Sequence, residues 1–170
     1  GDYNPGGKLA VTFPRSVGQI PFAFPFKPGS DSKGFVRVTG SLYPFGYGLS
    51  YTTFAYRDLE IDNPVIGIQG SVKLSCKVKN TGKVAGDEVV QLYLCDEVSS
   101  VTTYVKVLCG FERIHLRPGE EKEVSFILTP QELGLWNKDN HFVVEPGTFS
   151  VMIGSSSEDI RLQGMFDVRS

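Results

Sequence analysis

The strongest constraint on the fold is a strict alternation of apolar and polar side chains within short stretches of residues 57–170. The stretch "SVKLSCKV" (71–78) alternates at every position. In "DEVVQLYLC" (87–95) Val90, Leu92 and Leu94 fall on one face, and in "KEVSFILT" (122–129) Val124, Phe126 and Leu128 do so. A period of two residues is typical of a strand with one buried face. No long segment has the three- and four-residue apolar spacing of an amphipathic helix. The positions expected to face the core are Val72, Leu74, Cys76, Val78, Val90, Leu92, Leu94, Val124, Phe126 and Leu128.

Turn sequences separate these strands. "RPGE" (117–120) places Pro at the second and Gly at the third turn position, which predicts a type II turn, and "EPGT" (145–148) repeats this pattern. Further β-prone runs occupy 104–116 and 149–168, whereas "TPQELGLWN" (129–137) is expected to hold one short helical turn. About seven short strands with regular turns predict an all-β, two-sheet antiparallel sandwich.

Residues 1–56 differ in composition and are expected to run extended, largely outside the sheets. They hold six of the ten prolines and nine of the 19 glycines, and proline fixes φ and removes a hydrogen-bond donor. A short strand is expected only at Leu9–Phe13. The aromatic-rich stretch "LYPFGYGLSYTTF" (42–54) nevertheless lies here. Buried aromatic side chains each remove about 150–250 Å² from water, so this segment must pack against another surface.

Charge and hydropathy exclude two classes of partner. The chain has 17 basic and 19 acidic residues and a net charge of −2, without a basic cluster, so no nucleic-acid partner is expected. No apolar stretch approaches the ~20 residues of a membrane span, so no membrane partner is expected either. The chain starts with Gly1 and a turn-rich sequence. We therefore expect it to be part of a longer polypeptide, a glycine left by a tag being the alternative.

The polar residues form no recognisable catalytic, metal or cofactor motif, and no cofactor is expected. Cys76, Cys95 and Cys109 lack metal-ligand spacing and are interpreted as small strand residues, with a single disulfide left open. His115 and His141 are interpreted as surface residues. Adjacent acids on a strand point to opposite faces and make poor catalytic pairs. The adjacent pairs are Asp87/Glu88, Asp96/Glu97, Glu120/Glu121 and Glu158/Asp159.

Three blocks of the chain resemble one enzyme family. They are "GDYNPGGKLAVTFPRSVGQIP" (1–21), "LYPFGYGLSYTTFAY" (42–56) and "LCGFERIHLRPGEEKEVSFILTPQELGLWN" (108–137). In order and spacing they are similar to the C-terminal part of glycoside hydrolase family 3, the β-glucosidases and β-xylosidases that carry a fibronectin type III-like domain. Cys109 stands where lysine is common in the family, which leaves the implied fold intact and the preferred sugar open.

The resemblance implies a layout and a role. Residues 1–20 would be the end of a preceding α/β sandwich domain, 21–56 a connector, and 57–170 an immunoglobulin/fibronectin type III-like sandwich. The family's catalytic aspartate and glutamate lie in upstream domains and have no counterpart here, so no catalytic residue is expected. The chain would be a non-catalytic module that stabilises or positions the upstream catalytic domains of a periplasmic or secreted β-glycosidase. Such a parent enzyme would hydrolyse terminal non-reducing β-linked sugars, β-glucosides first among them.

An independent carbohydrate-binding module is the main alternative, and a plain protein-interaction sandwich is a third. Flat pyranose faces stack on aromatic rings, and the candidate rings are Tyr43, Tyr47, Tyr51, Tyr104 and Trp136. Structural packing is the favoured interpretation of these rings, with Trp136 at the rim of the sandwich core and Tyr43, Tyr47 and Tyr51 against the connector or between domains. A docking module is expected to expose an apolar patch rimmed by polar residues, whereas a sugar module is expected to hold rings in a groove.

Overall fold

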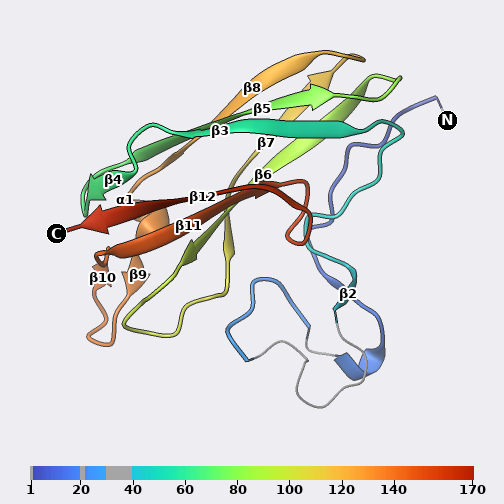
Figure 1. Ribbon diagram of the computed structural model, residues 1–170. Coiled ribbons are helices and arrows are strands. Elements are labelled where there is room, and N and C mark those ends of the chain that lie inside the picture. The colour runs from blue at the N-terminus through green and yellow to red at the C-terminus, as the bar shows by residue number, and fades with distance from the viewer. Residues whose placement is uncertain (1, 20–21, 30–39) are drawn as a thin grey trace.

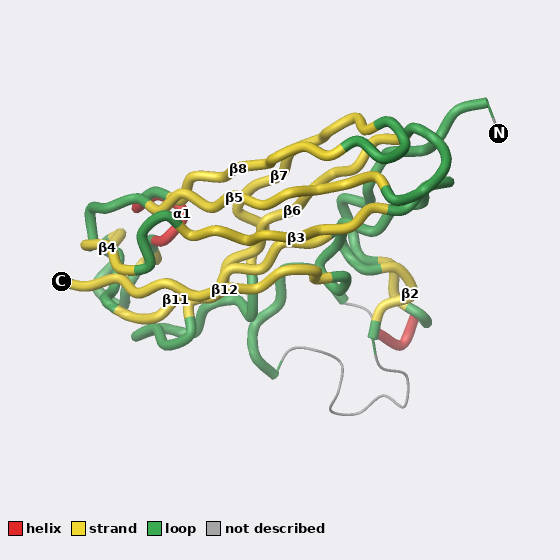
Figure 2. The backbone as a smooth tube through the Cα atoms, turned by 45° about the horizontal axis from the view of Figure 1, so that its top comes forward, coloured by secondary structure: helices red, strands yellow, loops and turns green. Residues whose placement is uncertain are grey.

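Two antiparallel sheets stacked face to face make up most of the molecule in the computed structural model, which describes residues 2–19, 22–29 and 40–170 (Figures 1 and 2). The smaller sheet has the order β3-β5-β8, formed by Phe54–Ile61, Val72–Asn80 and Glu121–Leu128. The larger sheet has the order β4-β12-β11-β6-β7, formed by Val65–Gly67, Ile160–Arg169, Gly147–Gly154, Gly86–Asp96 and Val107–Leu116. Among the strands of the described residues, only β4 and β12 pair in parallel, at one edge of the larger sheet. The predicted all-β sandwich is confirmed.

Short elements flank the sandwich. Two ribbons pair β1 (Phe13–Pro14) with β2 (Ser41–Tyr43) and β9 (Leu135–Trp136) with β10 (Phe142–Val143). A 3-10 turn, η1, covers Val17–Gln19, and the predicted helical turn is α1, Pro130–Leu133. Within the described part of the chain, no helix has the length and apolar character needed to cross a bilayer.

The core lies between the two sheets and follows the predicted alternation. Val72, Leu74, Cys76 and Val78 of β5 are all buried, and they face the apolar side of β6. Each large apolar side chain buried in this way contributes about 1.5–3 kcal/mol to folding. Cys76, Cys95 and Cys109 are free thiols, so the disulfide left open by the sequence is not formed. Burial raises the pKa of Cys76 to about 11 and that of Cys109 to about 12.

One of the two predicted type II turns is present and the other is not. Gly119 has a φ of 78° and Glu120 donates its N–H to the carbonyl of Arg117 at 2.9 Å, as the "RPGE" pattern predicts. The prediction for "EPGT" is wrong. Gly147 has no positive φ and is the first residue of β11, where it pairs with Val168 of β12. Pairing with β12 thus takes precedence over local turn chemistry.

The strand predicted at Leu9–Phe13 is also corrected. Leu9 exchanges backbone hydrogen bonds with the 46–47 stretch, at 2.8 Å each way, but the chain bends at residues 10–11. Only Phe13–Pro14 continues as a strand, because β2 offers it a short partner with a shifted register. Regular pairing therefore covers two residues of this segment.

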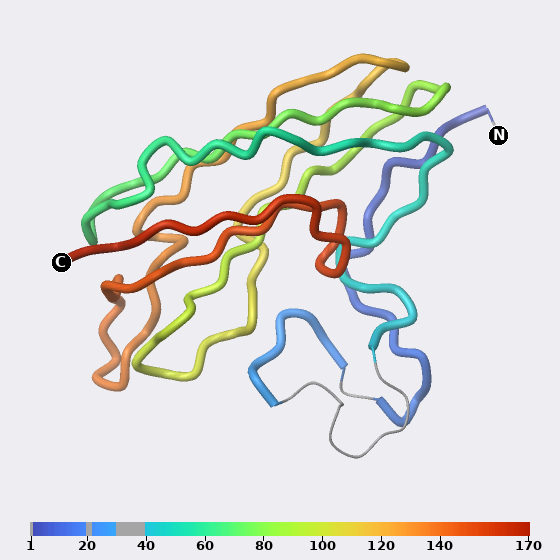
Figure 3. The backbone as a smooth tube through the Cα atoms, viewed as in Figure 1, coloured from blue at the N-terminus to red at the C-terminus, as the bar shows by residue number. Residues whose placement is uncertain are grey.

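The described residues before β3, namely 2–19, 22–29 and 40–53, form one extended unit that we call the N-terminal arm (Figure 3). The arm contains little regular structure, as its proline and glycine content predicts. It packs beside the first half of β6, on the outer face of the larger sheet. As a result, β6 is buried on both faces, unlike the half-buried strand that its sequence alternation predicts.

Candidate functional site

Gln91, on β6, joins the N-terminal arm to the sandwich. Its buried amide nitrogen Nε2 donates to the carbonyls of Gly46 (3.1 Å) and Ser155 (2.7 Å), and its Oε1 accepts from the hydroxyl of Tyr93 (2.5 Å). A buried amide stabilises a fold only when its polar atoms are paired in this way. Gly46 has a φ of 80°, and a Cβ at that residue would lie 2.0 Å from Gln91 Oε1, so the contact requires glycine.

Aromatic stacking and one ion pair extend this junction. The rings of Phe24 and Phe45 stack with centroids 4.8 Å apart, and Phe24 meets Tyr93 edge-on at 5.6 Å. The Lys8 ammonium lies 2.9 Å from the carboxylate of Glu88, and both side chains are largely buried. Phe45 of the aromatic-rich stretch therefore packs with Phe24 over β6, and this packing holds the arm against the sandwich.

The outer side of the arm is apolar and exposed. It carries a shallow groove of about 560 Å³ that is lined by Leu9, Phe13, Tyr43, Tyr47 and Leu49. The rings of Tyr43 and Tyr47 stack at 5.1 Å, and Phe13 meets Tyr43 edge-on at 6.2 Å. The structure thus brings two of the predicted residues, Tyr43 and Tyr47, together on what we call the arm face.

Tyr51 lies apart from this groove. Its backbone N–H donates to Oδ1 of Asn4 at 2.8 Å, and its ring is exposed. Its side chain does not line the groove of the arm face. Tyr51 is therefore placed near the arm face but outside the groove, and its predicted contact role stays a prediction.

The other two predicted rings, Tyr104 and Trp136, line a second cavity at the opposite end of the sandwich. This cavity has a volume of about 410 Å³ and lies between the 97–106 loop and the β9–β10 ribbon, which run side by side in Figure 3. Its floor is apolar and includes Leu94, Leu133 and Phe149. We call this cavity the Tyr104–Trp136 cleft.

Two carboxylates line the same cleft. Burial raises the pKa of Asp96. The hydrogen bond that its Oδ1 accepts from the N–H of Val98 at 3.3 Å lowers the pKa, but burial is the larger effect. Glu132 behaves differently: burial acts to raise its pKa, but the N–H and hydroxyl of Thr129, at 2.8 and 2.7 Å, prevail and lower it. Glu132 therefore serves as the N3 residue of the capping box of α1 while it faces the cleft.

Two neighbouring acids of β6 bond to basic groups. On the outer face of the larger sheet, Asp87 bonds to His115 Nδ1 at 2.6 Å and to the guanidinium of Arg113, while the adjacent Glu88 pairs with Lys8. His115 is exposed, as predicted from its strand position. No cluster of three or more potential metal-ligating side chains occurs among residues 2–19, 22–29 and 40–170.

Sequence reasoning missed several residues of these sites. The sequence patterns do not predict a role for Gln91, which anchors the arm, or for Lys27 and Phe142, which contact the cleft rings. For Gln91 a signal existed, because the run "VVQLYL" (89–94) is dense in apolar residues at successive positions and indicates a strand covered on both faces. For Lys27 and Phe142 no local signal exists, since their role depends on contacts between distant segments.

Comparison with known proteins identifies the domain family and the relatives of this chain. Residues 88–157 match the model of the fibronectin type III-like domain family. The chain is 51% identical over 162 residues to a β-xylosidase from Formosa agariphila, covering 93% of the chain and 22% of that protein. It is 46% identical over 179 residues to a periplasmic β-glucosidase from Salmonella typhimurium, covering 99% of the chain and 23% of that protein.

Solved structures agree with the sequence comparisons. A β-glucosidase from Erythrobacter marinus matches with a TM-score of 0.93 and 38% identity over 99% of the chain, and 22% of that structure is covered. A β-glucosidase from Listeria innocua, solved with glucose, matches with a TM-score of 0.89 and 34% identity. The chain spans less than a quarter of the length of the curated relatives described above. The chain carries a fibronectin type III-like domain and corresponds to a C-terminal portion of the glycoside hydrolase family 3 enzymes.

Proposed function

We propose that this chain is a non-catalytic module of a longer β-glycosidase, in which it packs against the catalytic domains and stabilises or positions them. The longer protein is proposed to hydrolyse terminal non-reducing β-linked sugars, with β-glucosides as the preferred class. The names of the relatives, β-glucosidases and a β-xylosidase, support this substrate class.

The main support for the proposal is that the N-terminal arm has one side anchored on the sandwich and another side that is apolar and exposed. One side is anchored on β6 through Gln91 and the Phe24–Phe45 stack. On the other side, the exposed side chains of Phe13, Tyr43 and Leu49 line the apolar groove, and Val11, Val17 and Leu42 are further exposed apolar side chains of the arm. Contiguous apolar surface of this kind is typical of an interaction site. A segment that is fixed on one side and apolar on the other is suited to fill the interface between two domains.

The division of the chain follows from the same proposal. Residues 1–20 would complete the preceding α/β sandwich domain, residues 21–56 would connect the domains, and residues 57–170 would form the fibronectin type III-like domain. The start of β3 at Phe54 and the scarcity of strands before it support this division.

Substitution of the arm face tests the proposal in the longer protein. We expect Phe13→Ala combined with Tyr43→Ala to lower the melting temperature by several degrees and to reduce activity on an aryl β-glucoside. The physical reason is that two buried rings would be removed from the domain interface, at about 3–5 kcal/mol each when fully buried. Phe111→Ala is the matched control, because Phe111 is an exposed aromatic residue on β7 that does not line the groove of the arm face.

Two results would contradict the proposal. Unchanged stability and activity in the double variant would show that the arm face is not an interface. Cleavage of an aryl β-glucoside or β-xyloside by this chain alone would show that the chain is itself catalytic. In that case a carboxylate pair would have to be sought among its turn acids.

A further inference from the structure

We propose that the Tyr104–Trp136 cleft is a binding site for a neutral, β-linked oligosaccharide. This inference is independent of the proposed docking function, because the cleft lies at the opposite end of the sandwich from the arm face and shares no lining residue with it. The cleft combines exposed rings, an apolar floor and hydrogen-bonding groups. This combination fits the apolar faces and hydroxyl-rich edges of pyranose rings.

Trp136 is exposed and yet held in place. Its side chain is 63% exposed, and its position in the β9–β10 ribbon places it directly opposite Phe142. The two rings meet edge to face, with centroids 5.7 Å apart. Phe142 in turn packs on the backbone of Gly134, where a Cβ would lie 2.3 Å from the ring. A large ring fixed in this way offers contact area at low entropic cost, which is a feature of binding surfaces.

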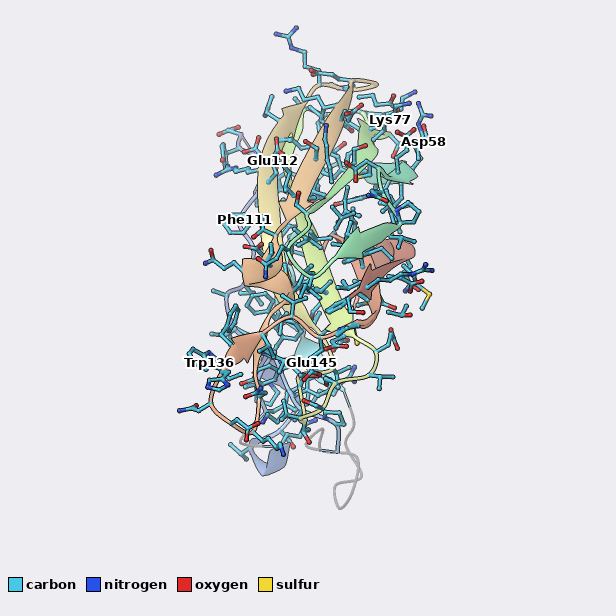
Figure 4. The ribbon with its side chains drawn as sticks, turned by 90° about the vertical axis from the view of Figure 1, so that its left-hand side faces the viewer. Asp58, Lys77, Phe111, Glu112, Trp136 and Glu145 are labelled. Carbon is cyan, nitrogen blue, oxygen red and sulfur yellow. The ribbon has the colours of Figure 1, made fainter. Side chains whose placement is uncertain are left out.

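Tyr104 supplies a second ring from the 97–106 loop. The ammonium of Lys27 lies over this ring, 5.9 Å from its centroid, and Lys27 also lines the cleft. Tyr104 is 44% exposed despite this contact. Two partly exposed rings from different segments therefore share one cavity, whereas the exposed Phe111 lies elsewhere on the molecule, as Figure 4 shows.

The 97–106 loop that presents Tyr104 is tethered at several points. Ser99 donates to the carbonyl of Val101 at 2.9 Å, and the N–H of Ser100 donates to Glu145 at 2.8 Å. The N–H of Val105 donates to the carbonyl of Phe26 at 2.9 Å, which ties the loop to the N-terminal arm. These bonds hold one wall of the cleft in place before any ligand arrives, and such preorganisation reduces the cost of binding.

The charges of the lining select a neutral ligand. Asp96 and Glu132 contribute two carboxylates, and Lys27 contributes one ammonium. Thr102 and Thr103 also line the cleft, and a threonine hydroxyl can both donate and accept hydrogen bonds, although that of Thr103 already bonds to the Ser99 hydroxyl at 3.1 Å. Carboxylates accept bonds from sugar hydroxyls but repel uronic acids and phosphates. The volume of about 410 Å³ lies in the range of ordinary ligand sites and suits a short oligosaccharide.

The test is a titration of this chain with cellotetraose and xylotetraose. Trp136 is the only tryptophan in the chain, so its fluorescence reports on the cleft directly. We expect a saturable change in emission, with a Kd between about 10 µM and 1 mM. Tyr104→Ala should weaken binding about tenfold, because a stacking ring is lost, and Tyr104→Phe should retain most of the affinity. Trp136→Ala, followed by NMR or calorimetry, should abolish binding.

Phe111→Ala is the matched control and should bind as the unchanged chain does. The proposal is overturned if no saturable change occurs up to about 10 mM sugar, which corresponds to a negligible affinity. It is also overturned if Phe111→Ala loses as much affinity as Tyr104→Ala, or if an oligogalacturonate binds as well as the neutral sugars. Because these readouts use the isolated chain, a failure here is distinct from a failure of the docking proposal.

Discussion

Gly46 shows how a single residue fixes the position of the arm. Its φ of 80° and its contact with Gln91 both exclude a side chain, whereas Gly119 has a similar φ of 78° with no atom within 4 Å of a Cβ. Strain in this region of backbone space costs about 1–3 kcal/mol. Gly46→Ala should therefore destabilise the chain by more than Gly119→Ala, which adds strain alone.

The comparison is made by urea denaturation and by hydrogen exchange of both variants. In Gly46→Ala the amide of Leu9, which donates to the carbonyl of Tyr47 at 2.8 Å, should exchange faster because the arm lifts from β6. In Gly119→Ala this amide should keep its protection. Equal effects of the two substitutions would mean that the Gln91 contact does not position the arm.

Tyr56 and Tyr93 differ in the pairing of their hydroxyls. The Tyr56 hydroxyl is buried and has no hydrogen-bond partner among the described residues, and burial raises its pKa. The Tyr93 hydroxyl donates to Gln91. Tyr56→Phe should therefore raise the free energy of unfolding by about 1 kcal/mol, whereas Tyr93→Phe should lower it by about 1–3 kcal/mol. Denaturant midpoints of both variants check the opposite signs, and a loss of stability in Tyr56→Phe would contradict the expectation.

At the scale of elements, the pairing of β6 with β7 carries a pH-dependent contribution. Asp87 on β6 faces His115 and Arg113 on β7. The hydrogen bond from His115 is the largest cause of a lowered pKa for Asp87; burial opposes it, and Arg113 lowers the pKa further. A carboxyl with a lowered folded-state pKa stabilises the protein above its unfolded pKa of about 3.9. This contribution is lost as the pH falls through the lower pKa of the folded state.

Asp87→Asn tests this linkage. At pH 7 the variant should be less stable by up to about 1 kcal/mol, the range of partly exposed ion pairs. The gap should narrow as the pH falls from about 3.9 through the lower folded-state pKa, because the carboxyl of Asp87 is protonated first in the unfolded chain and then in the folded protein. The check is the urea midpoint as a function of pH. A gap that is constant from pH 7 to strongly acidic solution would show that the carboxylate charge contributes nothing.

On the scale of the whole molecule, the arm is expected to stay folded against the sandwich. The amides of Leu9 and Gly46 each donate within the arm at 2.8 Å, and Lys8 pairs with Glu88 of β6. These two amides should exchange at least about 100-fold more slowly than unstructured ones at every protein concentration. Hydrogen exchange at several concentrations measures this. Uniformly fast exchange at residues 2–19 would contradict it.

Local sequence patterns were enough to predict the main strands, one turn and the short helix. Alternation placed β5, β6 and β8 and selected their core-facing residues, because a strand repeats every two residues and exposes that period in the sequence. "RPGE" determined its turn, since Gly119 takes the positive φ that few residues tolerate, and "TPQE" determined α1 through its capping box. The three sequence blocks also pointed to the enzymes whose C-terminal portion this chain resembles, those of glycoside hydrolase family 3.

Features that arise from packing between distant segments could be seen only in the three-dimensional structure. It covered the outer face of β6 with the arm, placed Gly147 in a strand opposite Val168, and brought Tyr104 and Trp136 to one cleft. Local periodicity encodes which face of a strand is apolar, but it contains no information about which remote segment packs there. This packing explains the aromatic-rich stretch 42–54, since one side of the arm covers β6 and the other remains exposed.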